Sequence, residues 1–174
     1  FLHQLVSSQL DMDRMDYLNR DSFFTGVSEG IIGSDRIIEM LDVHENQLVV
    51  EQKGIYSVEK FLVARRLMYW QVYMHKTVVS SEFMLNKVLQ RAKYLSKQNV
   101  PLFSSPALKL FLVNDYDLID FKNNAKILET FAQLDDYDIM GAVKVWQLHE
   151  DKILSTLSQR LVNRRLLKIE ISKQ

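Results

Sequence analysis

Helix-breaking residues are scarce in this chain, and their scarcity limits the possible folds more than any other feature of the sequence. Only 5 glycines and 2 prolines occur among its 174 residues. Because these two residues interrupt helices most often, long uninterrupted helices are expected. Apolar residues recur at helical spacing over several stretches. The sequence therefore predicts a mostly α-helical fold, with helices over residues 9–24, 57–75, 81–97, 107–113, 122–134 and 136–163.

Strands are expected in two places only. The stretch 36–54 predicts a small hairpin, because Leu48, Val49 and Val50 favour strands and residues 44–46 favour a turn. The closing residues 166–171 alternate apolar and polar side chains, which is typical of a strand. Elsewhere we expect loops, over the glycine-containing stretch 25–35 and between Pro101 and Pro106, and a break or bend at the Ser-rich stretch 77–81.

Composition excludes several classes of function. Lysine plus arginine equals aspartate plus glutamate, at 22 each, so the chain as a whole shows no preference for nucleic acid or an anionic membrane. Cysteine is absent, which excludes disulfides and thiolate metal sites and fits a cytoplasmic protein. No apolar run approaches the ~20 residues of a membrane span.

The two ends predict that the chain is a piece of a longer protein. It opens without a methionine or a signal peptide, and the strand expected at its end has no obvious partner. Apolar helix faces that normally pack on the remainder would then be exposed. Since exposed apolar patches favour self-association, we expect a homo-oligomer.

The stretch LDMDRMDYLNRD, residues 10–21, places unusually many aspartates in an expected helix. Aspartate is a poor residue inside a helix, because its short side chain competes for backbone groups. Asp13, Tyr17 and Asp21 fall within about 80° of one another on one helical face, and Arg14 lies beside them. Convergent oxygens of this kind suit a metal ion or sugar hydroxyls.

A simpler interpretation of the same stretch is a solvated helix face. Asp16 with Arg20, and Asp11 with Arg14, have the spacing of ordinary surface ion pairs. The opposite side of the helix would then be a buried apolar stripe, for which we expect Leu10, Met12, Met15, Leu18, Phe23 and Phe24.

A second stretch combines cations with aromatic residues. Arg65, Tyr69 and Tyr73 are spaced i, i+4 and i+8, and Lys76 follows closely. A guanidinium can grip phosphate oxygens with two hydrogen bonds, while aromatic rings contact a sugar or a base. The arrangement therefore suits a nucleotide. The alternative is that the tyrosines are amphipathic core residues with solvated hydroxyls.

Together, residues 7–26 and 58–77 resemble the HD-domain deoxynucleoside triphosphate (dNTP) triphosphohydrolases. This family includes bacterial dGTP triphosphohydrolases and the vertebrate sterile-alpha-motif/HD dNTPase. The resemblance is strong over residues 5–98, where the pattern D-x-D-[RK]-x-D-Y-x-x-R-D is highly specific. It is weaker over 134–146 and 157–170. It implies one helical HD-superfamily segment, with active-site helices and the hairpin in residues 1–98 and a C-terminal helical part in 99–174.

The resemblance also implies roles for individual residues. Asp13 matches the last metal ligand of an H…HD…D set, and Arg14 matches a basic residue that touches the triphosphate. Tyr17 and Asp21 match residues that hold the deoxyribose. Arg65 matches a phosphate-binding arginine. These matches imply a dNTP substrate and a divalent metal, which could be Mn, Mg, Fe or Zn.

Further positions match the family less closely. Tyr73 matches a residue packed near the sugar and base. Met74 stands where family members carry a glutamine that reads the base edge, which puts base discrimination in question. Four positions align with effector-nucleotide sites of regulated members, namely Lys53, His75, Lys76 and Arg164.

The histidines of the metal set are missing from this chain. Its four histidines are His3, His44, His75 and His149, and none is followed by aspartate. We therefore expect the missing HD segment to be the N-terminal part of the same polypeptide, and this piece alone to be inactive. Two alternatives stay open, an HD phosphohydrolase of another phosphoester and a helical interaction module without chemistry.

Overall fold

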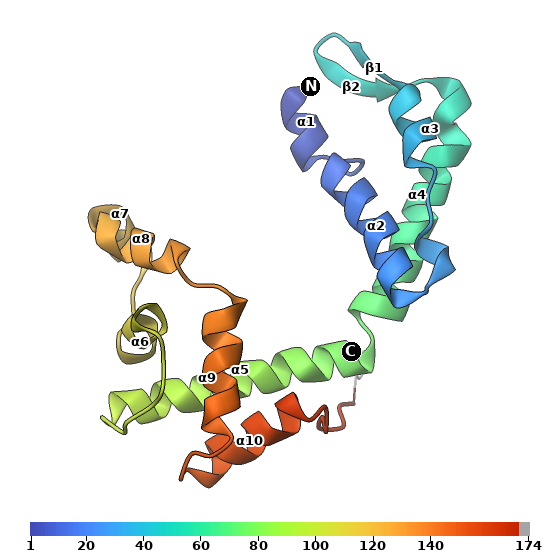
Figure 1. The fold of residues 1–174 in the computed structure, drawn as a ribbon. Coiled ribbons are helices and arrows are strands. Elements are labelled where there is room, and N and C mark those ends of the chain that lie inside the picture. The colour runs from blue at the N-terminus through green and yellow to red at the C-terminus, as the bar shows by residue number, and fades with distance from the viewer. Residues whose placement is uncertain (171–174) are drawn as a thin grey trace. The chain divides into compact units, whose positions relative to one another are not determined.

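The structure is a computed structural model that describes residues 1–170 (Figure 1). The chain divides into two compact units, Phe1–Val78 and Val79–Gln174. Their boundary differs from the division at residue 98, which followed the extent of a resemblance and not a compact unit. Helices dominate, and the described residues form one two-stranded sheet. The predicted mostly α-helical fold with a small hairpin is confirmed.

Unit 1 begins with two helices followed by the hairpin. Its elements are α1 (Leu2–Ser7), α2 (Met12–Thr25), η1 (Ser28–Gly30), α3 (Ser34–Glu39), β1 (Leu41–His44), β2 (Gln47–Val50), η2 (Gln52–Gly54), α4 (Ile55–Met68) and the π-helical turn η3 (Tyr69–Tyr73). The strands are antiparallel, with Leu41 opposite Val50 and His44 opposite Gln47. The Gln4 side chain of α1 accepts a hydrogen bond from the Leu48 backbone N–H at 2.8 Å, which ties α1 to the hairpin.

Helix α2 has clear start and stop signals. Asp11 caps its N-terminus, and Gly26 ends it with a left-handed backbone, φ 72°. The predicted helix 9–24 is thus confirmed with a slightly later start. The chain then returns along α2, where Gly30 lies so close to Met68 and Ser22 that a Cβ atom would meet them at 2.7 to 2.9 Å. The predicted loop 25–35 is therefore replaced in part by η1 and α3.

The core of unit 1 lies between α2 and α4. Met15 and Leu18 of α2 pack in one cluster with Phe61, Ala64 and Met68 of α4. The buried stripe predicted for α2 is correct at Met15 and Leu18 but wrong at its end. Phe23 is 81% exposed and Phe24 is 78% exposed.

The break after α4 falls earlier than predicted. The helix expected over 57–75 changes to the π-helical turn at Tyr69, where the Met74 N–H donates to the Tyr69 carbonyl at 2.8 Å. Helix α5 (Lys76–Lys97) then runs without interruption through residues 77–81. The break or bend predicted at 77–81 is therefore wrong.

Within the described residues, unit 2 contains five shorter helices after α5. They are α6 (Pro106–Val113), α7 (Leu118–Asn123), α8 (Ala125–Ala132), α9 (Asp136–Trp146) and α10 (Lys152–Val162). The core joins residues of α5, α6, α9 and α10, with Val88, Ala92, Trp146 and Leu154 at its centre. The Trp146 indole N–H donates to the Phe103 carbonyl at 2.9 Å. None of the described helices has the length and hydropathy of a membrane span.

Two sequence predictions for unit 2 are wrong. The single helix expected over 136–163 is interrupted, because Asp151 caps a new helix, α10. Residues 166–170 form no strand, and residue 171 lies outside the described part of the chain. The helix expected over 122–134 is present as α8, while Asn124 separates it from α7.

Candidate functional site

An open cleft of about 690 Å³ in unit 1 is lined by three of the predicted site residues, Asp13, Arg14 and Tyr17. The turn between α1 and α2 forms one part of its wall, the first turns of α2 form another, and η3 contributes one ring. Its lining residues are Val6, Ser7, Ser8, Gln9, Asp11, Asp13, Arg14, Tyr17 and Tyr69. The cleft therefore presents two carboxylates, a guanidinium and two phenols.

Arg14 is held against the start of its own helix. The buried Asp11 carboxylate accepts the Arg14 backbone N–H at 2.7 Å and also pairs with the Arg14 guanidinium. The same guanidinium donates to the Ser8 carbonyl at 2.7 Å. Asp11 and Arg14 are therefore a largely buried pair and not the surface pair of the simpler interpretation. Asp16 and Arg20 do form an exposed ion pair, at 2.9 Å.

Arg65 reaches the same turn from α4. Its Nη1 donates to the Gln9 side-chain oxygen at 2.8 Å, although 56 residues separate the two. The Arg65 guanidinium carbon lies 5.9 Å from the Tyr69 ring centroid. The turn at residues 8–11 therefore contacts both arginines that the sequence singled out.

Three tyrosines and a carboxylate form a cluster of contacts next to Arg65. The ring centroids of Tyr69 and Tyr73 lie 5.3 Å apart, and those of Tyr73 and Tyr17 lie 5.9 Å apart, both edge to face. The Tyr73 hydroxyl donates to the Asp21 carboxylate at 2.7 Å. The π-helical turn brings both of its tyrosines to α2, and π-helical turns are frequent at functional sites.

Burial dominates the electrostatics of this cluster. It raises the pKa of Tyr17, and Tyr69 adds to this shift, while Arg65 and Arg14 lower that pKa. Burial and the hydrogen bond to Asp21 raise the pKa of Tyr73. Both phenols therefore keep their protons well above neutral pH, and Tyr73 remains a donor to Asp21.

Asp13 lies in the cleft as an exposed carboxylate. Within residues 1–170, no group of three or more histidine, aspartate and glutamate side chains could hold a metal ion. The described residues therefore do not fit a complete metal site, since metals of this class need several fixed donors.

The remaining predicted residues lie outside the cleft lining. Met74 is exposed at the end of η3, and Lys76 is exposed at the start of α5. The His75 ring nitrogen accepts the Thr77 N–H at 3.3 Å. Lys53 pairs with Glu51 at 2.7 Å. Arg164 belongs to unit 2 and is exposed after α10, with φ 54°.

Sequence reasoning paired Asp11 with Arg14 but missed that Asp11 caps α2, and it missed the contacts of Ser8 and Gln9 with the two arginines. Aspartate is a preferred N-cap residue, and Asp11 stands directly before the first residue of α2. Its capping role could therefore have been predicted from the sequence. Gln9 and the Ser8 carbonyl have no such signal, because their partners depend on the turn and on a distant helix.

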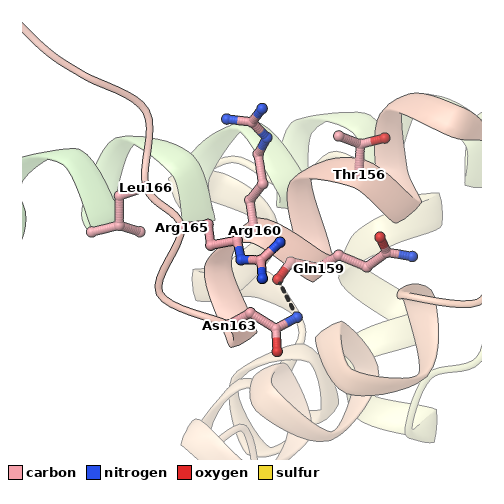
Figure 2. Close-up of a pocket in the computed structure, with 6 residues that line it drawn as sticks. All are labelled: Thr156, Gln159, Arg160, Asn163, Arg165 and Leu166. Carbon is pink, nitrogen blue, oxygen red and sulfur yellow. Dashed lines mark hydrogen bonds between the residues drawn. The ribbon is translucent and has the colours of Figure 1, made fainter.

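Unit 2 has its own pocket, of about 370 Å³, at the end of α10 (Figure 2). Thr156, Gln159, Arg160, Asn163, Arg165 and Leu166 line it. The Asn163 side chain donates to the Gln159 carbonyl at 2.8 Å, and the Arg165 N–H donates to the Arg160 carbonyl at 2.8 Å. No residue predicted for the nucleotide site lies in this lining.

Comparison with known families assigns the chain to a class. The family model of the HD associated region matches residues 32–126, which is more than half of the chain. The chain therefore belongs to the HD associated region family and is an HD-superfamily protein.

Individual relatives support this assignment. A solved structure of a phosphohydrolase from Bacteroides thetaiotaomicron VPI-5482 is 64% identical, with a TM-score of 0.94 over 98% of this chain and 42% of that one. The YwfO protein of Bacillus subtilis (strain 168) is 39% identical over 93% of this chain and 35% of its own length. A deoxynucleoside triphosphate triphosphohydrolase SAMHD1 homolog of Dictyostelium discoideum is 30% identical over 56% of this chain and 19% of its own length. The chain thus spans less than half the length of these relatives.

Proposed function

We propose that this chain forms the nucleotide-contacting part of a longer HD phosphohydrolase that converts dNTPs to deoxynucleoside and triphosphate. The observation that carries the proposal is the convergence of Asp13, Arg14 and Tyr17 in one cleft, with Arg65 bonded to its edge. The phosphohydrolase and the triphosphohydrolase among the relatives support the same chemistry.

The two arginines would bind the triphosphate. Each uses Nη1 for its bonds to the turn at residues 8–11, and a guanidinium has five donors. The other N–H groups of Arg14 and Arg65 would then be available to phosphate oxygens. Fixed guanidinium groups stabilise negative charge as it develops on a leaving triphosphate.

The tyrosine cluster would select the sugar. Tyr17 and the Tyr73–Asp21 pair would enclose the deoxyribose, with the Asp21 carboxylate as acceptor for a sugar hydroxyl. The packed rings leave a restricted space, so an additional 2′-hydroxyl should be disfavoured. The exposed thioether of Met74 cannot read hydrogen bonds of a base edge, so we expect weak base preference.

Any divalent metal would need further donors from outside residues 1–170. Asp13 would contribute one carboxylate, and the remaining donors would come from a segment with the family's histidines. Lys53, His75, Lys76 and Arg164 stay proposed effector contacts.

The test compares substrates in the complete polypeptide. It should hydrolyse all four dNTPs at similar rates and the matching ribonucleotides much more slowly. Preference for ribonucleotides, or turnover of another phosphoester only, would overturn the proposed sugar selection.

A further inference from the structure

The two arginines at the cleft are held by chemically different groups. The Arg14 guanidinium pairs with the buried Asp11 carboxylate, so a negative charge compensates its positive charge. The Arg65 guanidinium instead donates to the side-chain amide oxygen of Gln9 at 2.8 Å. An amide oxygen accepts a hydrogen bond without carrying a charge. Gln9 therefore fixes a cation without neutralising it.

Over residues 1–170, the side-chain partners of Arg65 are uncharged. Besides its bond to Gln9, the guanidinium lies beside the Tyr69 ring, 5.9 Å from the ring centroid. None of the ion pairs formed within these residues involves Arg65. The residue is also half-buried, so water screens its charge less than at a fully exposed position. Arg65 therefore brings an uncompensated positive charge to the edge of the cleft.

The bond from Gln9 restricts a side chain that would otherwise be mobile. Arg65 lies in the last turn of α4, whereas Gln9 lies in the turn between α1 and α2. A free arginine side chain samples many rotamers, and a ligand that immobilises it loses affinity in doing so. Gln9 and the Tyr69 ring hold the guanidinium before any ligand arrives. An anion that binds to Arg65 therefore loses less of its affinity to side-chain ordering.

We propose that Gln9 is a positioning residue, which holds the uncompensated charge of Arg65 in place for the phosphate chain of the substrate. This inference rests on the proposed function, in which Arg65 contacts the triphosphate. Gln9 acts through Arg65, so its contribution should disappear when Arg65 is replaced. The neutral side chain is essential to the role, because a carboxylate at position 9 would compete with phosphate for the same guanidinium.

The test is calorimetric titration of the complete polypeptide with inorganic triphosphate. The variant Gln9→Leu keeps the approximate size of the side chain and removes the acceptor, so it should weaken triphosphate binding about fivefold. The matched control is Gln71→Leu. It removes another glutamine bond of unit 1, from the Gln71 side chain to the Glu29 carboxylate at 3.2 Å, and Gln71 does not line the cleft. The control should bind triphosphate like the original polypeptide.

The variant Gln9→Glu separates positioning from a merely structural role. The introduced carboxylate can still accept the bond from Arg65, so the free energy of unfolding in urea should not fall. Its charge compensates the guanidinium, so triphosphate binding should weaken at least about fivefold. If Gln9 only tied the turn to α4, this variant would bind triphosphate like the original polypeptide.

A double-mutant cycle tests whether Gln9 acts through Arg65. In an Arg65→Met background, adding Gln9→Leu should change the triphosphate affinity by less than about twofold. An equal loss in both backgrounds, unchanged binding by Gln9→Leu, or normal binding by Gln9→Glu would overturn the positioning role. The absence of measurable triphosphate binding by the original polypeptide would overturn it as well.

A dNTP hydrolysis assay on the same proteins tests the proposed function separately. If the complete polypeptide hydrolyses no dNTP while triphosphate binding responds to Gln9 as expected, the dNTP substrate is wrong and the role of Gln9 stands. If dNTPs are hydrolysed and the Gln9 variants bind triphosphate normally, the proposed function stands and the role of Gln9 is wrong.

Discussion

Replacing Asp11 with alanine should destabilise unit 1 through two separate losses. The Asp11 carboxylate caps α2 by accepting the Arg14 N–H at 2.7 Å. Loss of an N-cap acceptor costs about 1 kcal/mol. The same carboxylate pairs with the Arg14 guanidinium, whose side chain is 28% exposed. Loss of this partly screened pair costs about 1 kcal/mol more, so Asp11→Ala should lower the free energy of unfolding by about 2 kcal/mol.

Asp11→Asn is the matched control, because it retains a capping oxygen and removes the charge. Asparagine caps helices about as well as aspartate. The Asn variant should therefore lose only the ion-pair part, about 1 kcal/mol. Urea unfolding followed by circular dichroism measures both variants, and hydrogen exchange of the α2 amides assigns the loss to unit 1.

Two results would refute this reasoning. If Asp11→Asn is as destabilised as Asp11→Ala, the cap contributes nothing measurable. If Asp11→Ala changes the free energy of unfolding by less than about 0.5 kcal/mol, which is typical of surface positions, the buried carboxylate does not hold the start of α2.

Three further predictions follow from titratable pairs and from donor count. The raised pKa of Tyr73 means that the folded state keeps a proton that the unfolded state loses, so stability should fall above about pH 10. The variant Tyr73→Phe should lose less stability over this alkaline range than the original chain. An equal loss in both proteins, measured by urea unfolding, would contradict this prediction. Arg91 holds the pKa of Asp151 at about 2, so the stabilisation is complete above about pH 4 and disappears toward pH 2. The variant Arg91→Gln should show a smaller loss of unfolding free energy as the pH falls toward 2. A loss as large as that of the original chain would refute this prediction. The 174-residue chain alone should bind Mn²⁺ poorly and hydrolyse no dNTP, so micromolar affinity in calorimetry together with turnover would show that the site is complete within it.

Helical periodicity predicted the elements better than their ends. Met15 and Leu18 are buried because they share one side of α2 with Ser22. Phe24 lies about 180° around the helix from Met15, so its exposure follows from the same geometry once the phase of the helix is fixed. The apolar character of Phe23 and Phe24 had outweighed that phase in the prediction.

The break between α4 and α5 depends on more than local propensity. The β-branched residues Thr77, Val78 and Val79 lower helix propensity only slightly. Helix α5 continues through them, and Ser80 is buried, with its hydroxyl donating to the Leu167 carbonyl at 2.6 Å. The change to a π-helical turn at Tyr69 has no sequence signal of its own.

Part of the candidate site could be predicted from the sequence, because its residues in α2 recur at intervals of about one helical turn. The spacing of Asp13, Tyr17 and Asp21 places them on one helical face, whatever the rest of the fold. The bond from Arg65 to Gln9 could not be predicted, since it joins residues 56 positions apart. Tertiary packing alone brings α4 to the turn before α2.

The phosphate product of the complete polypeptide tests the central claim most directly. With a dNTP, the account predicts deoxynucleoside and intact inorganic triphosphate, with no pyrophosphate. Asp13→Ala should abolish this release, whereas Asp16→Ala should retain it, because Asp16 forms an exposed ion pair with Arg20 and does not line the cleft. Release of pyrophosphate and a nucleoside monophosphate, or full triphosphate release by Asp13→Ala, would contradict the account.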